Sequence, residues 1–332
     1  MIDCMDTKET PTFLALPNPV TALRKGFDAV ANHVGLILFP LALDLWIWLG
    51  PHLQVKTLLN ALVRWITETA ALDPNYKPGM LDSSLELLAT IQERLNVMIF
   101  LRTYPVGVPS LMAGSLPLGS PLGSPQMVDV QSGSVVIGWW MVLGVAGLVL
   151  GSLYFLLVAR VTHPEQLKIS ETLRHWPKVA LQTVFLTLLM VVILFAISAP
   201  ASCMLTLVAQ GGSGLGQTAL IVLMVMVMWV AFPLLFAPHG IYAYGDTMMV
   251  SLRKSMRVTR LTFPTTSLLF LVVLVASQLL DSLWRVPPED SWLTIAGLIG
   301  HAFLATALLA TTFVYYRDAD AFVQKMMEKL KG

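Results

Sequence analysis

The sequence predicts an all-α polytopic membrane protein with six transmembrane helices. Three observations support this fold class. The chain is 56% hydrophobic and 12% charged, with a mean hydropathy of +0.72, whereas soluble domains carry about 25% charged residues. Several apolar stretches reach the length of about 20 residues that a spanning helix needs. Lys and Arg are concentrated on alternate connections between these stretches, as the positive-inside rule describes. We treat residues 1–332 as a single membrane domain.

The apolar stretches are expected to be helices, because in lipid every backbone polar group must be hydrogen-bonded within the protein. The first is the weakest, since it is short and contains Pro40 and Asp44. It is expected to remain as a span, because the N-terminal MIDCMDTKET lacks the basic region and apolar core of a cleavable signal peptide. The six predicted spans are 31–50, 135–159, 179–206, 218–238, 263–284 and 292–316.

The distribution of basic residues predicts the orientation of the chain. With the N-terminus inside, most of the 21 Lys and Arg residues fall on inner segments. The two short outer loops, 207–217 and 285–291, contain only Arg285. We therefore predict a multi-pass protein of the bacterial cytoplasmic (inner) membrane, with both termini cytoplasmic.

Similar basic stretches precede the first, third and fifth spans. They read ALRKGF at 22–27, TLRHWP at 172–177 and SLRKSM at 251–256. In the third, apolar residues gather on one side of a helix, as in basic helices that lie in the interface beside anionic lipid. We predict three hairpins, each preceded by a cytoplasmic interfacial helix; the alternative is that any inward-facing loop collects basic residues. The residues predicted to face anionic lipid are Arg24, Lys25, Arg174, Arg253, Lys254, Arg257 and Arg260.

The first hairpin carries a long extracytoplasmic insertion at 51–134. Residues 57–71 have apolar residues at helical spacing, and a second amphipathic helix is expected to start at Ser83, with Glu86 completing a capping box. A loop rich in Pro, Gly and Ser follows and contains LGSP twice. Its many apolar residues favour packing on the membrane surface or on the bundle, although a disordered insertion explains the composition as well.

A family resemblance rests on the C-terminal half. The stretch SLRKSMRVTRLTFP, followed by an apolar helix and a final hairpin that ends in YYRD, resembles bacterial integral membrane proteins of the glycerophosphoryl-diester-phosphodiesterase membrane-domain type and related six-span families. The likeness covers mainly residues 160–320. It implies a membrane domain without a defined active site, so no functional residue is carried over. The soluble phosphodiesterase barrel of that family is absent from this sequence.

Motifs for catalysis are missing from the sequence. It contains neither the P-loop G-x-x-x-x-G-K-[ST] nor the zinc motif H-E-x-x-H. Cys4 and Cys203 are far apart and indicate neither a disulfide framework nor a metal site. We therefore expect no enzyme, no cofactor and no bound metal.

Polar residues within predicted spans are costly in lipid and are functional candidates by default. At about 1.5 Å per residue, Asp44 lies about 9 Å and His301 about 13 Å from the outer ends of their spans. A closed bundle could pair them, either as a proton- or cation-responsive site or as a static packing contact; alternatively, Asp44 reaches the headgroups. The intramembrane candidates are Asp44, His301, Gln278, Asp281 and Gln182.

Glycines in the second span predict a close approach to a neighbouring segment. Gly147 and Gly151 form G-x-x-x-G, with Gly144 close to the same face. We expect intramolecular helix packing there in preference to dimerisation.

These observations favour a non-enzymatic integral membrane protein that acts as a scaffold, an assembly partner or a lipid-interacting subunit. Its expected partners are membrane lipids and a protein in a membrane complex, and near-zero net charge gives no reason to expect nucleic acid. The alternative is a small-solute or ion transporter or channel with a polar site at Asp44 and His301. A lipid-active enzyme is disfavoured because no nucleophile or metal constellation is present.

Overall fold

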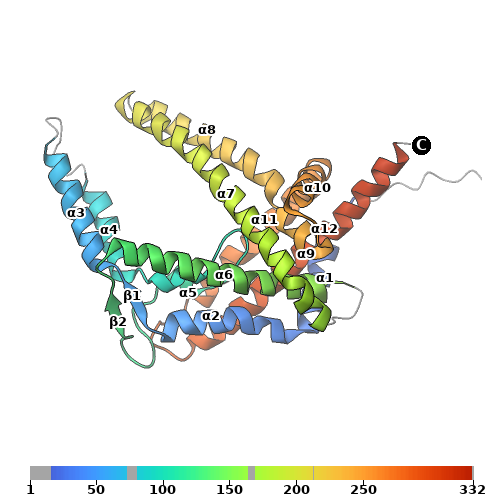
Figure 1. Cartoon of the computed structure of the whole chain (residues 1–332), viewed down its shortest axis with the longest axis horizontal. Helices are drawn as coiled ribbons and strands as arrows, with labels where there is room; N and C mark the ends of the chain where they lie inside the picture. The colour runs from blue at the N-terminus through green and yellow to red at the C-terminus, as the bar shows by residue number, and fades with distance from the viewer. Residues whose placement is uncertain (1–15, 73–80, 164–168, 212, 331–332) are drawn as a thin grey trace, which may run out of the picture.

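The computed structural model describes residues 16–72, 81–163, 169–211 and 213–330, and it is mostly helical (Figure 1). Five helical segments are long and apolar enough to cross a membrane, and a sixth span results if one sharply bent helix pair is counted as a single span. The five segments lie in α6 (Gly133–Val161), α7 (Ile169–Gly211), α8 (Ser213–Ala231) continuing through α9, α11 (Phe263–Trp284) and α12 (Thr294–Lys329). The composition-based prediction of a helical, membrane-compatible chain is therefore confirmed.

Helix α12 is the central element of the bundle. Of its most apolar window, 72% is buried inside the protein, against 11% for α7 and for α11. Small residues on α12 allow this, because helices in lipid gain most from close van der Waals packing. Helix α1 (Pro19–Ala31) lies along it, and a Cβ added to Gly26 would come within 2.7 Å of the Thr311 backbone. The buried small residues of α12 are Thr294, Gly297, Ala302, Thr306, Ala307, Ala310, Thr311, Thr312 and Ala319.

The first predicted span, 31–50, corresponds to η1 (Val34–Ile37) and α2 (Leu38–Leu49). Helix α1 precedes this segment and meets it at 89°. Asn18 caps α1 by accepting a hydrogen bond from the backbone N–H of Val20 at 2.9 Å. At about 1.5 Å per residue, Val34–Leu49 measures about 24 Å, which is less than the roughly 30 Å hydrocarbon core of a membrane.

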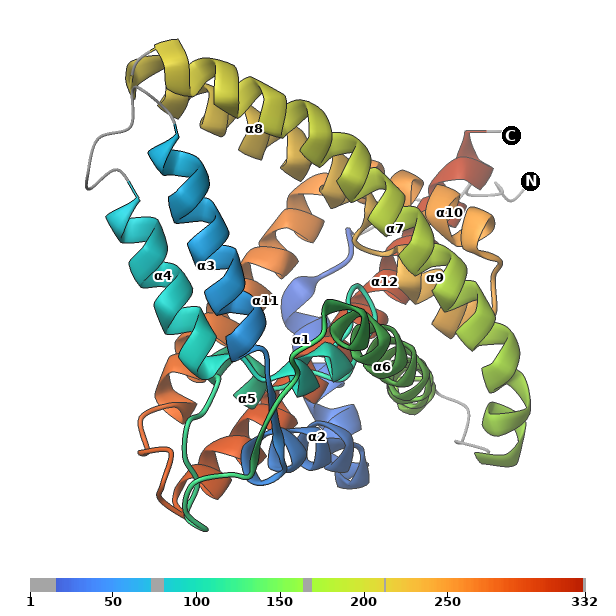
Figure 2. The ribbon, with the colours of Figure 1, turned by 60° about the vertical axis from the view of Figure 1, so that its left-hand side comes forward.

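The predicted threefold pattern of interfacial helices is wrong for its second unit. Helix α10 (Met248–Leu261) is separate from α11, because Thr262 leaves the helical conformation between them. Residues 172–177, in contrast, belong to the continuous helix α7. Pro177 removes one backbone donor there, but the helix continues through it, and Figure 2 shows α7 curving near its N-terminal end.

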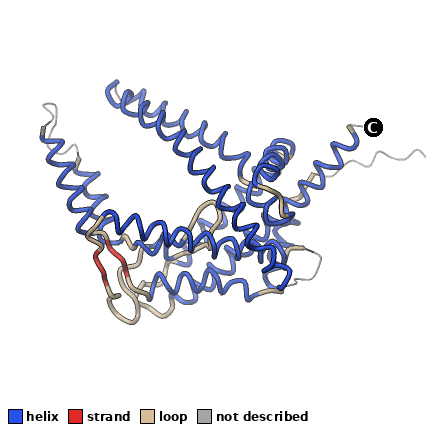
Figure 3. Tube along the Cα trace, in the orientation of Figure 1, coloured by secondary structure: helices blue, strands red, loops and turns tan. Residues whose placement is uncertain are grey.

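The insertion is closed by two short parallel strands (Figure 3). Strand β1 (His52–Gln54) pairs with β2 (Met127–Asp129). The chain between the two strands forms α3 (Lys56–Ala71), α4 (Asp82–Arg94), η2 (Val97–Leu101) and α5 (Met112–Ser115). Helix α4 begins at Asp82 with Leu81 at its N-cap and no side-chain cap. The predicted capping box at Ser83 is therefore wrong, since Ser83 already lies within the first turn.

The Pro/Gly/Ser-rich loop packs on the helices over part of its length. Val106, Val108, Leu111 and Met112 are buried, the first two against α6 and neighbouring helices and the last two beside Ile47 of α2. This burial explains why a loop so rich in helix-breaking residues contains so many apolar side chains.

The elements divide between two ends of the molecule (Figure 1). Helix α1, helix α10 and the C-terminal part of α12 lie at one end, where Lys25 Nζ is 3.8 Å from Asp318 Oδ2. The insertion lies at the other end with the α11–α12 connection, where Trp48 Nε1 donates to the Glu289 carbonyl at 2.9 Å. Figures 1 and 2 both show α7 and α8 running side by side away from the rest of the bundle.

Candidate functional site

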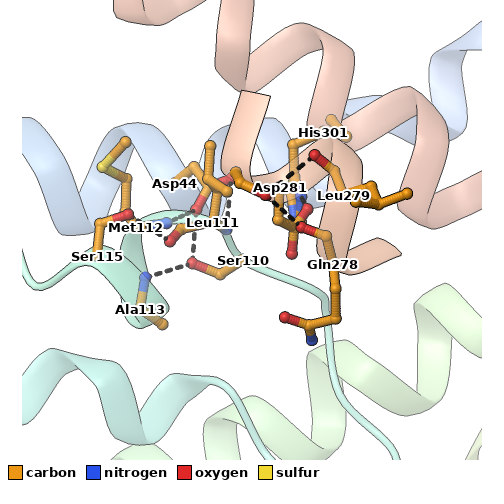
Figure 4. A network of polar contacts seen from close by, with 12 residues as sticks. Asp44, Ser110, Leu111, Met112, Ala113, Ser115, Gln278, Leu279, Asp281 and His301 are labelled. Carbon is orange, nitrogen blue, oxygen red and sulfur yellow. Dashed lines mark hydrogen bonds and ion pairs between the residues drawn. The ribbon is translucent and has the colours of Figure 1, made fainter. Parts of the chain in front are cut away.

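The buried carboxylate of Asp44 binds the turn that precedes α5 (Figure 4). Its Oδ1 accepts hydrogen bonds from Ser110 Oγ at 2.5 Å and from the Met112 N–H at 2.9 Å, and its Oδ2 accepts from the Leu111 N–H at 3.2 Å. Asp44 and Ser110 are almost completely buried. Three donors thus converge on a carboxylate that water does not reach, which is how proteins tolerate a buried charge.

Local structure explains how Asp44 reaches this turn. In α2, Pro40, Asp44 and Trp48 share one buried face, because residues four apart lie above one another on a helix. Ser110 Oγ also accepts a hydrogen bond from the Ala113 N–H at 3.0 Å. The side chains of Asp44 and Ser110 therefore satisfy backbone donors at the start of α5 that have no partner inside that short helix.

His301 has a different carboxylate partner. Its Nδ1 lies 2.8 Å from Asp281 Oδ1, while its Nε2 is buried and has no hydrogen-bond partner among the residues that the structure describes. Asp44 and His301 interact electrostatically, but each is hydrogen-bonded to other groups. The predicted direct Asp44–His301 pair is therefore wrong, because the turn at 110–112 and Asp281 already provide the closest partners.

Four of the five intramembrane candidates lie in one region and the fifth does not. Figure 4 shows Gln278 on the same side as Asp281 and His301; it is exposed, and its backbone carbonyl accepts from Ser282 Oγ at 2.7 Å. Gln182 instead accepts a hydrogen bond from the Met248 N–H at 2.9 Å and joins α7 to the start of α10. Gln182 thus has a packing role near the basic end.

Glu289 is a second polar link that sequence reasoning missed. One carboxylate oxygen accepts from the Leu118 N–H at 2.9 Å, and the other lies 3.5 Å from Arg94 Nη1. Together with the Trp48 contact, Glu289 ties the α11–α12 connection to both the insertion and α2. The only sign of this role in the sequence was that Glu289 is an acidic residue in a short predicted outer loop. No feature of the sequence pointed to a role for Ser110.

The G-x-x-x-G motif of α6 receives the end of the short 3-10 helix η2 and the loop that follows it. A Cβ on Gly147 would come 2.3 Å from the Leu101 carbonyl oxygen, and a Cβ on Gly151 would come 2.6 Å from the Cα of Gly107. Gly144 faces open space. The predicted close approach is real, but its partner is the segment 101–107 of the insertion.

His52 is a buried histidine of the insertion, outside the spans. Its Nε2 lies 3.2 Å from the Ile47 carbonyl oxygen. Burial lowers the pKa of His52 below its usual value, because the charged imidazolium would lose its hydration. The folded protein therefore favours the neutral ring.

Helix α10 packs on the protein through a face that the sequence prediction did not consider. Ser251, Ser255 and Thr259 point into the protein, and Ser251 Oγ donates to the Ala237 carbonyl at 2.5 Å. Met249 and Leu261 are exposed. The serine and threonine hydroxyls, spaced four residues apart, were the signal for the protein-facing side, since they bond across closely packed helices.

The predicted lipid-facing cations fall into two groups. Lys254 Nζ is bound to Asp246 Oδ2 at 2.8 Å, Lys25 pairs with Asp318, and Arg24 lies 3.9 Å from Asp28. The others are exposed and are Arg174, Arg253, Arg257 and Arg260. The exposed residues on α10 keep their charge available to the surroundings of the helix.

Searches with family models, characterised proteins and solved structures found no match for this chain. Over the described ranges, no group of three or more His, Cys, Asp or Glu side chains is arranged to hold a metal ion. The functional argument therefore rests on the geometry of the helices and of the polar links between them.

Proposed function

We propose that this chain is a non-enzymatic multi-pass membrane protein that acts as a scaffold or assembly subunit. In this proposal its α7–α8 hairpin binds another membrane protein. The observation that carries it is the contrast between a packed bundle around α12 and a long apolar hairpin that leaves the bundle. In the same proposal both termini lie on the cytoplasmic side of a bacterial inner membrane, and α10 contacts anionic lipid on that side.

The base of the hairpin is firmly attached. Trp176 Nε1 donates to Ser152 Oγ on α6 at 2.8 Å, and Thr183 Oγ1 lies 2.6 Å from the Tyr242 hydroxyl of α9. Leu186 is fully buried. These contacts fix the direction of the hairpin, so that a bound partner would be held at a defined position.

Beyond Leu186 many of the described apolar side chains of the hairpin are exposed, and the others are half-buried. No side chain described between 187 and 198 or between 221 and 231 is buried. In a membrane, lipid can cover such a surface, but association between helices in lipid is driven by van der Waals packing, for which this surface is available. Three exposed methionines on α8 add conformational adaptability. The most exposed residues are Phe195, Met224, Met228 and Trp229.

The remaining polar links support a structural role for the rest of the chain. Asp44, Glu289 and Gln182 each accept hydrogen bonds from backbone N–H groups of another element. Carboxylates and amides used in this way hold elements together and are not free to act on a substrate.

Site-specific photo-crosslinking tests the proposal. A benzophenone amino acid replaces Val192 on α7 or Trp229 on α8, and Val142 on α6 serves as an exposed control that is 61% accessible. We expect one discrete protein adduct, the same from both hairpin positions and absent from Val142. Adducts with lipid alone at all three positions would contradict the proposal.

A reporter assay tests the orientation separately. A reporter fused after Gly332 is expected to be active in the cytoplasm, and the same reporter inserted at Gly119 is expected on the opposite side. Gly119 suits the insertion because nothing lies within 4 Å of its Cβ position. Activity of both reporters on the same side would contradict the topology.

One observation favours a transporter as the second candidate function. Among the residues that the structure describes, His301 Nε2 is buried without a partner, in a region that contains the carboxylates of Asp44 and Asp281. Buried ionisable groups within a membrane domain are typical of ion and proton pathways. A proton or cation flux into vesicles containing the purified protein, abolished in His301→Gln, would favour this function over the scaffold.

A further inference from the structure

Two arginines from distant parts of the chain approach each other at the insertion end. An ideal Cβ at Gly114 would lie 2.6 Å from Arg285 Nη2 and 4.0 Å from Arg102 Nη1. The guanidinium of Arg285 therefore packs against Gly114, and the lack of a side chain there lets it lie close to the guanidinium of Arg102.

The nearby carboxylates are already occupied by other donors. Asp44 accepts from the turn at 110–112, Asp281 binds His301, and Glu289 pairs with Arg94. Arg102 uses one N–H to bond the Ser110 carbonyl at 2.9 Å and lies over the Tyr104 ring. The side chain of Arg285 has no hydrogen bond or ion pair with any residue that the structure describes, so the two guanidinium groups have free donors and uncompensated charge.

An apolar groove lies along α2. It has a volume of 470 Å³ and is lined on α2 by Leu38, Phe39, Ala42, Leu43 and Trp46, and elsewhere by Leu101, Val108 and Leu150. Leu101 adjoins Arg102 in the chain, and Ser110, which bonds Arg102, follows closely after Val108. From Trp46 to Leu38 the groove runs about 12 Å along α2, at about 1.5 Å per residue.

We infer that this end of the protein binds one phospholipid of net negative charge. Its phosphate lies between Arg102 and Arg285, and part of one acyl chain lies in the α2 groove. Guanidinium groups recognise phosphate oxygens through paired N–H donors. An apolar groove accepts hydrocarbon without losing any hydrogen bond. Arg285 follows Trp284 at the end of α11, where interfacial aromatic residues and phosphates are expected at the same depth.

This site differs from the basic surface of α10, which lies at the other end of the molecule. It also does not depend on a partner for the α7–α8 hairpin. The charge of two arginines selects a lipid with a net negative headgroup over a zwitterionic one, because the zwitterionic lipid brings its own cation to the same space.

The test uses the full chain in lipid nanodiscs that contain a trace of phosphatidylglycerol with a photoactivatable diazirine in one acyl chain. Peptide mass spectrometry maps the adducts, which are expressed relative to those on the exposed residues Leu271, Val272, Leu274 and Val275 of α11. We expect enrichment at 38–46 and 101–108, reduced at least five-fold in Arg285→Gln. A matched Arg257→Gln on α10 is expected to leave the enrichment unchanged.

Two further arms complete the experiment. Ala42→Trp, which fills the groove from an exposed position, is expected to remove the adducts at 101–108 while Arg285 is intact. A diazirine phosphatidylcholine is expected to give at least five-fold fewer groove adducts than the phosphatidylglycerol. Unchanged labelling in Arg285→Gln or in Ala42→Trp would overturn the inference, and so would equal labelling by the two lipids.

Discussion

The carboxylate of Asp44 accepts a hydrogen bond from the hydroxyl of Ser110 at 2.5 Å, across 66 positions of the sequence. This contact joins α2 to a loop rich in Pro, Gly and Ser, and with the two N–H donors beside it the contact fixes the position of that loop on α2. A charge that the sequence places in an apolar helix is therefore used to hold the insertion on the bundle.

Removal of this link is expected to destabilise the protein. In Asp44→Asn an amide N–H₂ would face a backbone N–H, and Ser110→Ala would leave the carboxylate without its hydroxyl donor; each costs about 1–3 kcal/mol. Because both variants break the same bond, the double variant should lose less than the sum of the two. Thermal unfolding in detergent measures these losses, and Ser282→Ala, which removes only a bond within α11, is the control. Additive losses would show that the two side chains do not interact.

The histidine pairing can be tested by comparing two double-variant cycles. The direct 2.8 Å contact between His301 and Asp281 predicts a large coupling between His301→Gln and Asp281→Asn. Asp44 and His301 share no hydrogen bond, so His301→Gln and Asp44→Asn should be coupled more weakly. Unfolding in detergent again provides the measurement. A stronger coupling through Asp44 would restore the pairing first predicted from the sequence.

The glycines of α6 offer a matched comparison on one helix. Gly151→Ala would push a methyl group against the Cα of Gly107 and is expected to cost about 1–3 kcal/mol through overpacking. Gly144→Ala meets nothing within 4 Å and is expected to be neutral or to stabilise by up to about 1 kcal/mol, because alanine favours a helix over glycine. The melting temperatures of the two variants decide this, and equal losses would contradict the packing described for Gly151.

His52 predicts a dependence of stability on pH. Its pKa is lowered in the folded state, so the unfolded chain takes up a proton first as the pH falls below about 6.5. The contribution of the buried, neutral His52 to the free energy of unfolding is therefore complete above about pH 6.5. It is lost as the pH falls towards the lowered pKa of the folded state. We expect His52→Gln to weaken the loss of stability between pH 7 and 5, as followed by thermal unfolding. His33→Gln, at an exposed histidine, should leave this loss unchanged; equal effects of both variants would exclude burial of His52 as the cause.

Composition and periodicity predicted most of the helices, because those signals lie within each segment. The contacts that define the candidate site could not be predicted in the same way. Asp44 and Ser110 are brought together only because the insertion folds back along α6, with backbone against Gly147 and Gly151. The pairing of His52 with Met127 likewise depends on segments that are distant in the chain. The residues within such a segment do not determine which of several hydrogen-bond acceptors on distant segments it binds.

Helix α10 shows a second limit of sequence reasoning. The pattern was read as an apolar side against a basic side, and the protein-facing side was missed because three of its four buried residues are Ser251, Ser255 and Thr259, with Val258 as the fourth. In a membrane-bound bundle small hydroxyl residues pack against protein and larger apolar residues can face lipid. The hydrophobic side of a helix is then a poor guide to its protein-facing side.

The mass of the complex released from membranes by a mild detergent tests the central claim, that the α7–α8 hairpin binds a membrane partner. For the wild-type chain we predict an assembly that contains a further polypeptide besides this one. Replacing Met228 and Trp229 together by Ala should release the single chain, whereas Val142→Ala with Val145→Ala on the exposed face of α6 should preserve the assembly. A wild-type chain that is released alone, with only lipid and detergent bound, would contradict the claim.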